Sequence, residues 1–94
     1  MQARSGWTFL SNHAHVLVAV ARDPSLRIRD LARLVGVTER AVAQILVDLE
    51  SAGAISKLKD GRRNAYEVHP DVPLRHPIEA HRTVYDILRL ATPN

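Results

Sequence analysis

The sequence predicts a single small domain that is mainly α-helical and carries one β-hairpin, an α+β fold. Four segments place apolar residues at helical spacing. A further segment has β-branched or aromatic residues on both sides of Asp60-Gly61, a pair that favours a tight hairpin turn. The chain has 94 residues, of which 46% are hydrophobic and only 4% aromatic. A chain of this length builds one modest core, which must here be aliphatic.

The first helix is expected to begin near Ser11 or Asn12, because either side chain can accept a hydrogen bond from a free amide at the helix start. It runs to about Ala21. Apolar residues cover most of its circumference, which indicates burial on more than one side. Residues 25–28, Ser-Leu-Arg-Ile, are predicted to form a short strand.

Residues 29–52 have the pattern of two short helices joined at Gly36. The chain must turn sharply after the first of them, and a left-handed backbone costs little only for glycine. Thr38 then caps the next helix, which Gly53 ends in the same left-handed conformation. Two short helices joined by a brief turn that contains glycine form a helix-turn-helix.

The remaining residues complete the predicted order of elements. The hairpin covers about residues 54–68. Residues 69–77 contain three prolines and are expected to be a linker. A final helix is predicted over residues 77–91, with Pro77 in its first turn, where a missing amide hydrogen does no harm.

Several positions of the helix pair resemble the spacing of the helix-turn-helix family: Leu31, Ala32, Val35, Gly36, Val37, Val42 and Ile45. Residues 49–53, Leu-Glu-Ser-Ala-Gly, resemble the L-E-x-x-G ending that such domains share before a β-hairpin wing. The chain is similar to small MarR- and ArsR-like winged helix-turn-helix transcriptional regulators of prokaryotes. That resemblance implies one winged helix-turn-helix domain over residues 1–94, with a C-terminal dimerisation helix at about 77–91.

The solvent face of the third helix is where a winged helix-turn-helix regulator would contact the major groove of DNA. Arg40 can donate two hydrogen bonds to guanine, and Gln44 can pair with the exposed edge of adenine. Ala43 is small enough for close approach, and an exposed Val47 suits a thymine methyl group. Thr38, at the helix N-terminus, is placed to contact a phosphate. A merely solvated face is the alternative.

Basic residues are concentrated in the predicted hairpin. The chain has a formal net charge of +3, and the window KLKDGRR, residues 57–63, alone has four basic residues and one acid, which also gives +3. Such a wing would follow the DNA backbone or enter the minor groove, although a solvated basic turn is the alternative. The residues concerned are Lys57, Lys59, Arg62, Arg63 and Asn64. Arg29 and Arg33 are predicted to hold phosphates, or else to form surface ion pairs with Asp30 or Asp23.

The last predicted helix has an apolar stripe that covers about half of its circumference, more than docking on one small domain requires. A homodimer with a two-fold axis would cover the surplus, and the first helix has a similar surplus. The predicted interface residues are His81, Val84, Tyr85 and Leu88. In the alternative, this helix docks wholly on its own domain, with Val84 and Leu88 in the core.

The sequence shows no nucleophile–base arrangement, paired-carboxylate motif or glycine-rich phosphate loop, so neither a catalytic residue nor an enzymatic activity is expected. There is no cysteine, and the five histidines lack chelating spacings, so neither a metal nor another cofactor is expected. A zinc site assembled from histidines across a dimer is the alternative. A small-molecule effector is allowed by the sequence but not indicated by it.

The expected function is therefore sequence-specific binding of double-stranded DNA by a dimeric transcriptional regulator. One alternative is a winged helix that binds proteins in a transcription assembly, which would usually have an acidic or apolar wing. Another is a binder of double-stranded RNA, which would recognise shape instead of base edges. No apolar run has the length of a signal peptide or of a bilayer span, so a cytoplasmic protein without a membrane partner is expected.

Overall fold

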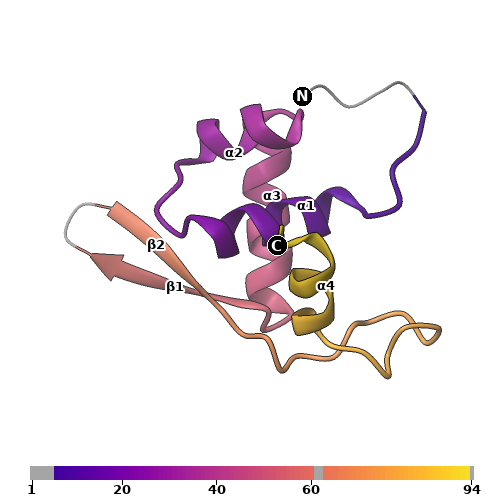
Figure 1. The fold of residues 1–94 in the computed structure, drawn as a ribbon. Coiled ribbons are helices and arrows are strands. Elements are labelled where there is room, and N and C mark those ends of the chain that lie inside the picture. Colours follow the sequence, from indigo (N-terminus) through magenta and orange to yellow (C-terminus); the bar gives the residue numbers. More distant parts are fainter. Residues whose placement is uncertain (1–5, 61–62, 94) are drawn as a thin grey trace.

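The computed structural model describes residues 6–60 and 63–93, and the side chains of residues 59, 60, 63 and 64 lie outside that description. Three helices, a two-stranded hairpin and a fourth helix follow one another along the chain (Figure 1). Their bounds are α1 Asn12–Arg22, α2 Ile28–Val35, α3 Glu39–Ser51, β1 Ile55–Asp60, β2 Arg63–Val68 and α4 Val84–Ala91. The predicted α+β class is confirmed. None of the helices described is long and apolar enough to cross a bilayer.

Side-chain caps begin α1 and α3 where the sequence predicts them. The Ser11 hydroxyl accepts a hydrogen bond from the Ala14 amide at 3.2 Å. The Thr38 hydroxyl accepts one from the Ala41 amide at 3.0 Å. Each bond satisfies an amide that has no partner within its own helix, so both helix starts are fixed by the local sequence.

Two glycines end α2 and α3 in the left-handed conformation, as predicted. Gly36 has a φ of 86°, and its amide donates to the Ala32 carbonyl at 2.8 Å. Gly53 has a φ of 81° and follows α3 directly after the cap residue Ala52. At Gly36 this geometry turns the chain sharply enough for α3 to begin three residues later and pack against α2.

The predicted strand at residues 25–28 is wrong. The Asp23 carboxylate accepts hydrogen bonds from the Ser25 amide at 3.2 Å and the Ser25 hydroxyl at 2.9 Å, which folds this segment into a turn. Ile28 is already the first residue of α2. The sheet described consists of β1 and β2 alone. No neighbouring strand therefore offers this segment hydrogen bonds that could replace the local bonds of the turn.

The last helix is shorter than predicted, since it begins at Val84 instead of Pro77. Residues 76–82 form successive turns in its place. In the first of these, the Glu79 amide donates to the His76 carbonyl at 2.9 Å. Pro77 therefore opens a turn and not a helix, for which its fixed φ is equally suitable.

The start of α4 is fixed by contacts with the proline-containing segment before it. Thr83 pairs with Pro73 in an isolated β-bridge, and the Val84 amide donates to the Val72 carbonyl at 2.9 Å. The Asp86 carboxylate accepts from the Thr83 amide at 2.9 Å and caps the helix. Because Thr83 is extended, a helix that began at residue 77 could not pass through it.

The core lies between α1, α2 and α3 and is closed by the start of β1 and the start of α4. It is aliphatic, as the composition requires. The largest fully buried side chains are Leu31, Ile55, Val16, Val20 and Val42. Val84 is 3% exposed and belongs to the same cluster, so α4 docks on its own domain through its first residue.

The predicted hairpin is confirmed and projects from the helices (Figure 1). β1 and β2 pair antiparallel, from Ile55 opposite Val68 to Asp60 opposite Arg63. Residues 61–62, which connect the two strands, lie outside the described residues.

Two further bonds hold the periphery of the domain together. At the base of the wing, the Ser56 hydroxyl and His69 Nε2 are 2.5 Å apart. The Arg22 guanidinium donates to the Ala91 carbonyl and thereby joins the C-terminal ends of α1 and α4.

Candidate nucleic-acid interface

The residues predicted to contact DNA bases lie together on the solvent side of α3. Arg40, Ala43 and Gln44 are exposed, and Val47 is 55% exposed. The opposite side of the helix carries its buried residues, which are Val42, Ile45, Leu46 and Leu49. Because this buried stripe fixes the rotation of α3 about its axis, the predicted contact residues face away from the core.

Thr38 lies at the N-terminal end of the same helix and is exposed. Its hydroxyl oxygen accepts the bond from the Ala41 amide. The hydroxyl hydrogen remains able to donate to an external acceptor, so the cap and the predicted phosphate contact are compatible.

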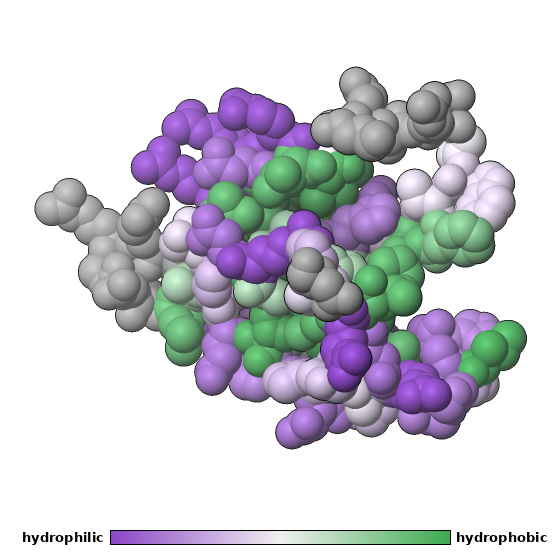
Figure 2. Space-filling model, in the orientation of Figure 1, coloured by the Kyte–Doolittle hydropathy of each residue, from purple (hydrophilic) through white to green (hydrophobic). Residues whose placement is uncertain are grey.

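Arg29 and Arg33 are both exposed on α2. Neither takes part in an ion pair within the described part of the chain. The acids predicted as alternative partners are bonded locally instead: Asp30 to the Arg27 amide, and Asp23 to Ser25. Figure 2 shows a strongly hydrophilic surface over α2, at the upper left of the molecule. This surface is next to the start of α3.

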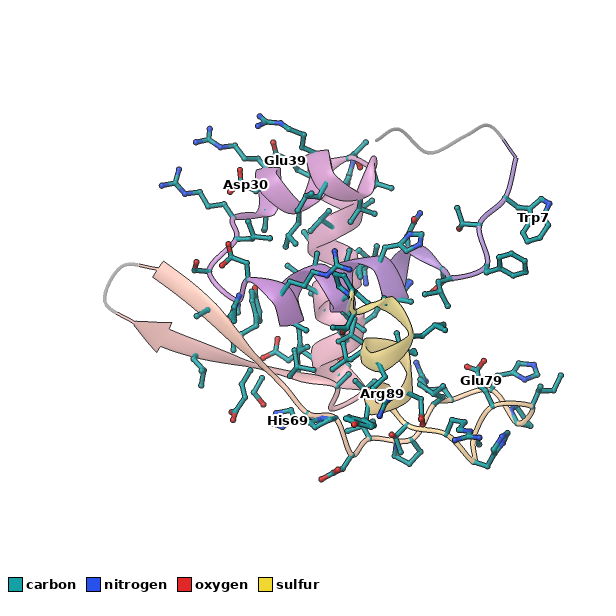
Figure 3. All side chains as sticks on the ribbon, viewed as in Figure 1. Trp7, Asp30, Glu39, His69, Glu79 and Arg89 are labelled. Carbon is teal, nitrogen blue, oxygen red and sulfur yellow. The ribbon has the colours of Figure 1, made fainter. Side chains whose placement is uncertain are left out.

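Two acids border the same end of the molecule. Asp30 and Glu39 are labelled side by side in Figure 3, near the starts of α2 and α3. Each lies in the first turn of its own helix, where the helix dipole favours negative charge. Their position has a local structural reason, although Glu39 is one helical turn from Ala43 and so borders the predicted contact face.

The predicted wing residues are only partly described. The side chain of Lys57 is exposed on β1. The side chains of Lys59, Arg62, Arg63 and Asn64 fall outside the described residues. The backbone register pairs Lys57 with Tyr66 and Lys59 with Asn64, so the predicted basic positions lie on the two strands of the hairpin and in its connection.

Asp48 is a residue of this interface that sequence reasoning missed. Its Oδ1 accepts a hydrogen bond from Gln44 Nε2 at 3.0 Å, and its Oδ2 lies 2.8 Å from His13 Nε2 on α1. These two bonds hold the pKa of the Asp48 carboxyl below its usual value, and the bond with His13 contributes more than the bond with Gln44. The signal was present in the sequence, because residues four apart on a helix are neighbours.

Two solved structures resemble this arrangement of helices and hairpin. The PcaV transcriptional regulator from Streptomyces coelicolor, in complex with its natural ligand, is 27% identical over 64% of this chain and 45% of its own, with a TM-score of 0.55. The zinc-dependent MarR family transcriptional regulator AdcR, in the Zn(II)-bound state, is 25% identical over 73% of this chain and 49% of its own, with a TM-score of 0.53. The chain is a MarR-like winged helix-turn-helix protein.

This MarR-like chain spans about half the length of the two regulators, with 45% and 49% of them covered. No protein-family model and no curated protein sequence matches it. The similarity to these structures therefore applies to the winged helix itself.

The predicted dimer residues on α4 of the MarR-like chain differ in how far they are buried. Val84 is buried in its own core, so its prediction as an interface residue is wrong, and the alternative of docking on its own domain holds for this residue. Leu88 is partly buried and packs against the same core. On α4, Tyr85 is 51% exposed, and Leu90, which is not among the predicted residues, is 72% exposed.

His81 is the remaining predicted interface residue. It lies in the turns before α4 and is exposed, so it does not belong to the apolar arc of that helix, and this part of the prediction is wrong. The physical reason is the late start of α4 at Val84.

The other histidines of the MarR-like chain have hydrogen-bond partners within the described structure. His13 is bonded to Asp48, His15 Nδ1 lies 3.3 Å from Asn12 Oδ1, and His69 is bonded to Ser56. His76 Nδ1 accepts from the Ile78 amide at 3.1 Å. In the described part of the chain, no three histidine or acidic side chains come together as a metal site.

A cavity of about 370 Å³ opens beside the His13–Asp48 pair. It lies between α1, the end of α3 and residues 72–79, and its wall is mostly apolar. Arg75 and Glu79 are among its charged lining residues. The described structure holds a space of the size that small ligands occupy.

Proposed function

We propose that this chain binds double-stranded DNA sequence-specifically and regulates transcription. One observation carries the proposal: the second helix of a helix-turn-helix exposes an arginine, a glutamine and a valine on one face, at Arg40, Gln44 and Val47. These side chains match the hydrogen-bonding and methyl groups that bases present in the major groove. An exposed valine in particular gains free energy when its apolar surface packs against another apolar group and leaves water.

Contacts to phosphates would position this helix in the groove without selecting a sequence. Arg29 and Arg33 on α2 are exposed and not paired with an acid in the described structure, and Thr38 has a free donor. The basic wing would hold the backbone on the other side of α3. Together these groups would place Arg40 and Gln44 against the base edges.

The proposed functional unit is a homodimer. Support comes from α4, where Tyr85 is 51% and Leu90 72% exposed although the start of the helix is buried. Two copies of this surface meeting across a two-fold axis would bury both side chains. The same axis would place the two α3 helices on half-sites about one helical turn of DNA, roughly 34 Å, apart.

The deciding experiment is selection of bound sequences from a library of random duplex DNA, followed by titration of the selected duplex against duplex RNA of the same sequence. A DNA regulator enriches one motif with two related halves and prefers the DNA. Equal binding to the RNA duplex would instead favour recognition of shape, and the absence of any enriched motif would contradict sequence-specific binding. A protein with the proposed function works in the compartment that holds the DNA, which in prokaryotes is the cytoplasm.

A further inference from the structure

The side-chain amide of Gln44 is held in one orientation. Its Nε2 donates one hydrogen to Asp48 Oδ1 at 3.0 Å. An amide nitrogen carries two hydrogens, and an ionised carboxylate only accepts. Rotation of the amide by half a turn would bring Gln44 Oε1 against Asp48 and is therefore disfavoured. One N–H donor and one oxygen acceptor of Gln44 remain free.

Asp48 is held in turn from another helix. Its Oδ2 is bonded to His13 Nε2, and α1 is anchored in the core next to His13 by the buried residues Ala14 and Leu17. The His13 and Asp48 side chains are 49% and 39% exposed. Exposed pairs of this kind add only a small increment to the stability of a fold, and their further effect is to orient the groups that they join.

The number of free donors on Gln44 decides which purine it matches. Guanine presents two acceptors in the major groove, N7 and O6, whereas adenine presents one acceptor, N7, and one donor, the N6 amino group. An unrestrained glutamine can satisfy either base, because it can offer two N–H groups or one N–H and one oxygen. With one N–H bonded to Asp48, Gln44 offers the pair that adenine requires.

We infer that Asp48, held by His13, is a specificity-determining positioning residue that restricts Gln44 to adenine over guanine. The inference rests on the proposed function. It concerns a residue that contacts Gln44 and not the base, so it predicts a change in discrimination and not a uniform change in affinity.

The test uses the full chain and the duplex selected from the random library. Affinity is measured for that duplex and for the same duplex with guanine in place of the adenine whose enrichment is lost by Gln44→Ala. Asp48→Asn keeps the size of the side chain, but its amide can either accept from Gln44 Nε2 or donate to Gln44 Oε1. Gln44 is then no longer restricted to one orientation and can also offer both of its N–H groups to a base. We expect Asp48→Asn to lower the preference for adenine over guanine roughly three- to tenfold.

Glu50→Gln is the matched control, because it removes the same charge from an exposed position of the same helix. It should leave the adenine preference unchanged, whatever it does to total affinity. His13→Gln should lower the preference by a smaller factor than Asp48→Asn. Circular dichroism melting shows that each variant is folded.

The outcomes separate the inference from the proposed function. If the wild-type chain enriches no motif, the proposed function fails. If it enriches a motif but Asp48→Asn keeps the same adenine preference as Glu50→Gln, the inference is overturned. In a Gln44→Ala background, Asp48→Asn should have no further effect on discrimination. A further effect there would show that Asp48 acts on the base itself and would also overturn the inference.

Discussion

The hydroxyl of Thr38 and the amide of Ala41 are joined by a 3.0 Å hydrogen bond that begins α3. Replacing Thr38 with Ala removes the acceptor and leaves this amide unbonded. We expect the free energy of unfolding to fall by about 1 kcal/mol, and the melting temperature by roughly 4–8 °C. Thr38→Ser keeps the acceptor and is the control. Both are measured by thermal denaturation at one fixed protein concentration, and equal melting temperatures for the two variants would contradict the capping role.

Arg40→Ala should change which sequences are bound. The loss of a paired contact to guanine is expected to cost about 1–3 kcal/mol on the preferred duplex and to relax preference at one position of each half-site. Arg33→Ala, from the proposed phosphate-contacting surface of α2, is the comparison. It should weaken binding to all sequences alike. Selection that returns the original motif at full strength with Arg40→Ala would exclude this residue from base contact.

Binding should depend strongly on salt. If a dimer neutralises about eight phosphates, the logarithm of the affinity falls against the logarithm of salt concentration with a slope of about −7. Changing Arg62 and Arg63 together to Ala should weaken binding to all duplexes and make the slope shallower by about two to four. A slope identical to that of the wild type would mean that the wing does not contact phosphates.

The dimer proposal is tested by charge at the exposed side of α4. Tyr85→Glu combined with Leu90→Glu should give a folded monomer that binds the complete site far more weakly, since two charged groups would be buried at the interface. Ile78→Glu changes a residue that is 81% exposed but lies before α4, and it should remain a dimer. Analytical ultracentrifugation at micromolar concentration distinguishes the two. Sedimentation of the wild-type chain as a monomer would contradict the proposal.

The Asp48 bonds should appear in the pH dependence of stability. Its pKa is held below the usual value of 3.8. A lowered pKa in the folded state means that the ionised group stabilises the fold above that usual value, and that this contribution is lost as the pH falls through the lower folded value. Between about pH 5 and pH 2, the wild type should therefore lose stability more steeply than Asp48→Asn. Parallel denaturation curves for the two, with Glu50→Gln as control, would show that Asp48 is not stabilised in the folded state.

Local chemistry made most of the fold predictable from the sequence. Ser11, Thr38, Gly36 and Gly53 act within three or four residues of their own positions, and all four take the predicted roles. The two elements predicted wrongly fail for different reasons. Residues 25–28 form a turn because Ser25 bonds locally to Asp23, whereas the start of α4 depends on a contact with a segment ten residues away. Pro77 suits the start of a helix, but the bridge of Thr83 to Pro73 decides where α4 begins.

The same distinction applies to the candidate site. The exposed face of α3 follows from its apolar period, so Arg40, Gln44 and Val47 could be placed from the sequence alone. The bond between His13 and Asp48 joins residues 35 positions apart, and no local sequence pattern predicts it. The apolar stripe predicts a partner surface at Val84, because the width of such a stripe does not say how much of it the same domain covers.

The two ends of α1 are attached to different parts of the molecule. His13, near its beginning, is bonded to α3, and Arg22, at its end, is bonded to the last residue of α4. A helix of 11 residues is a stiff rod of about 16 Å. The position of α1 therefore depends on both α3 and α4, because a side-chain bond fixes each of its ends to one of these helices.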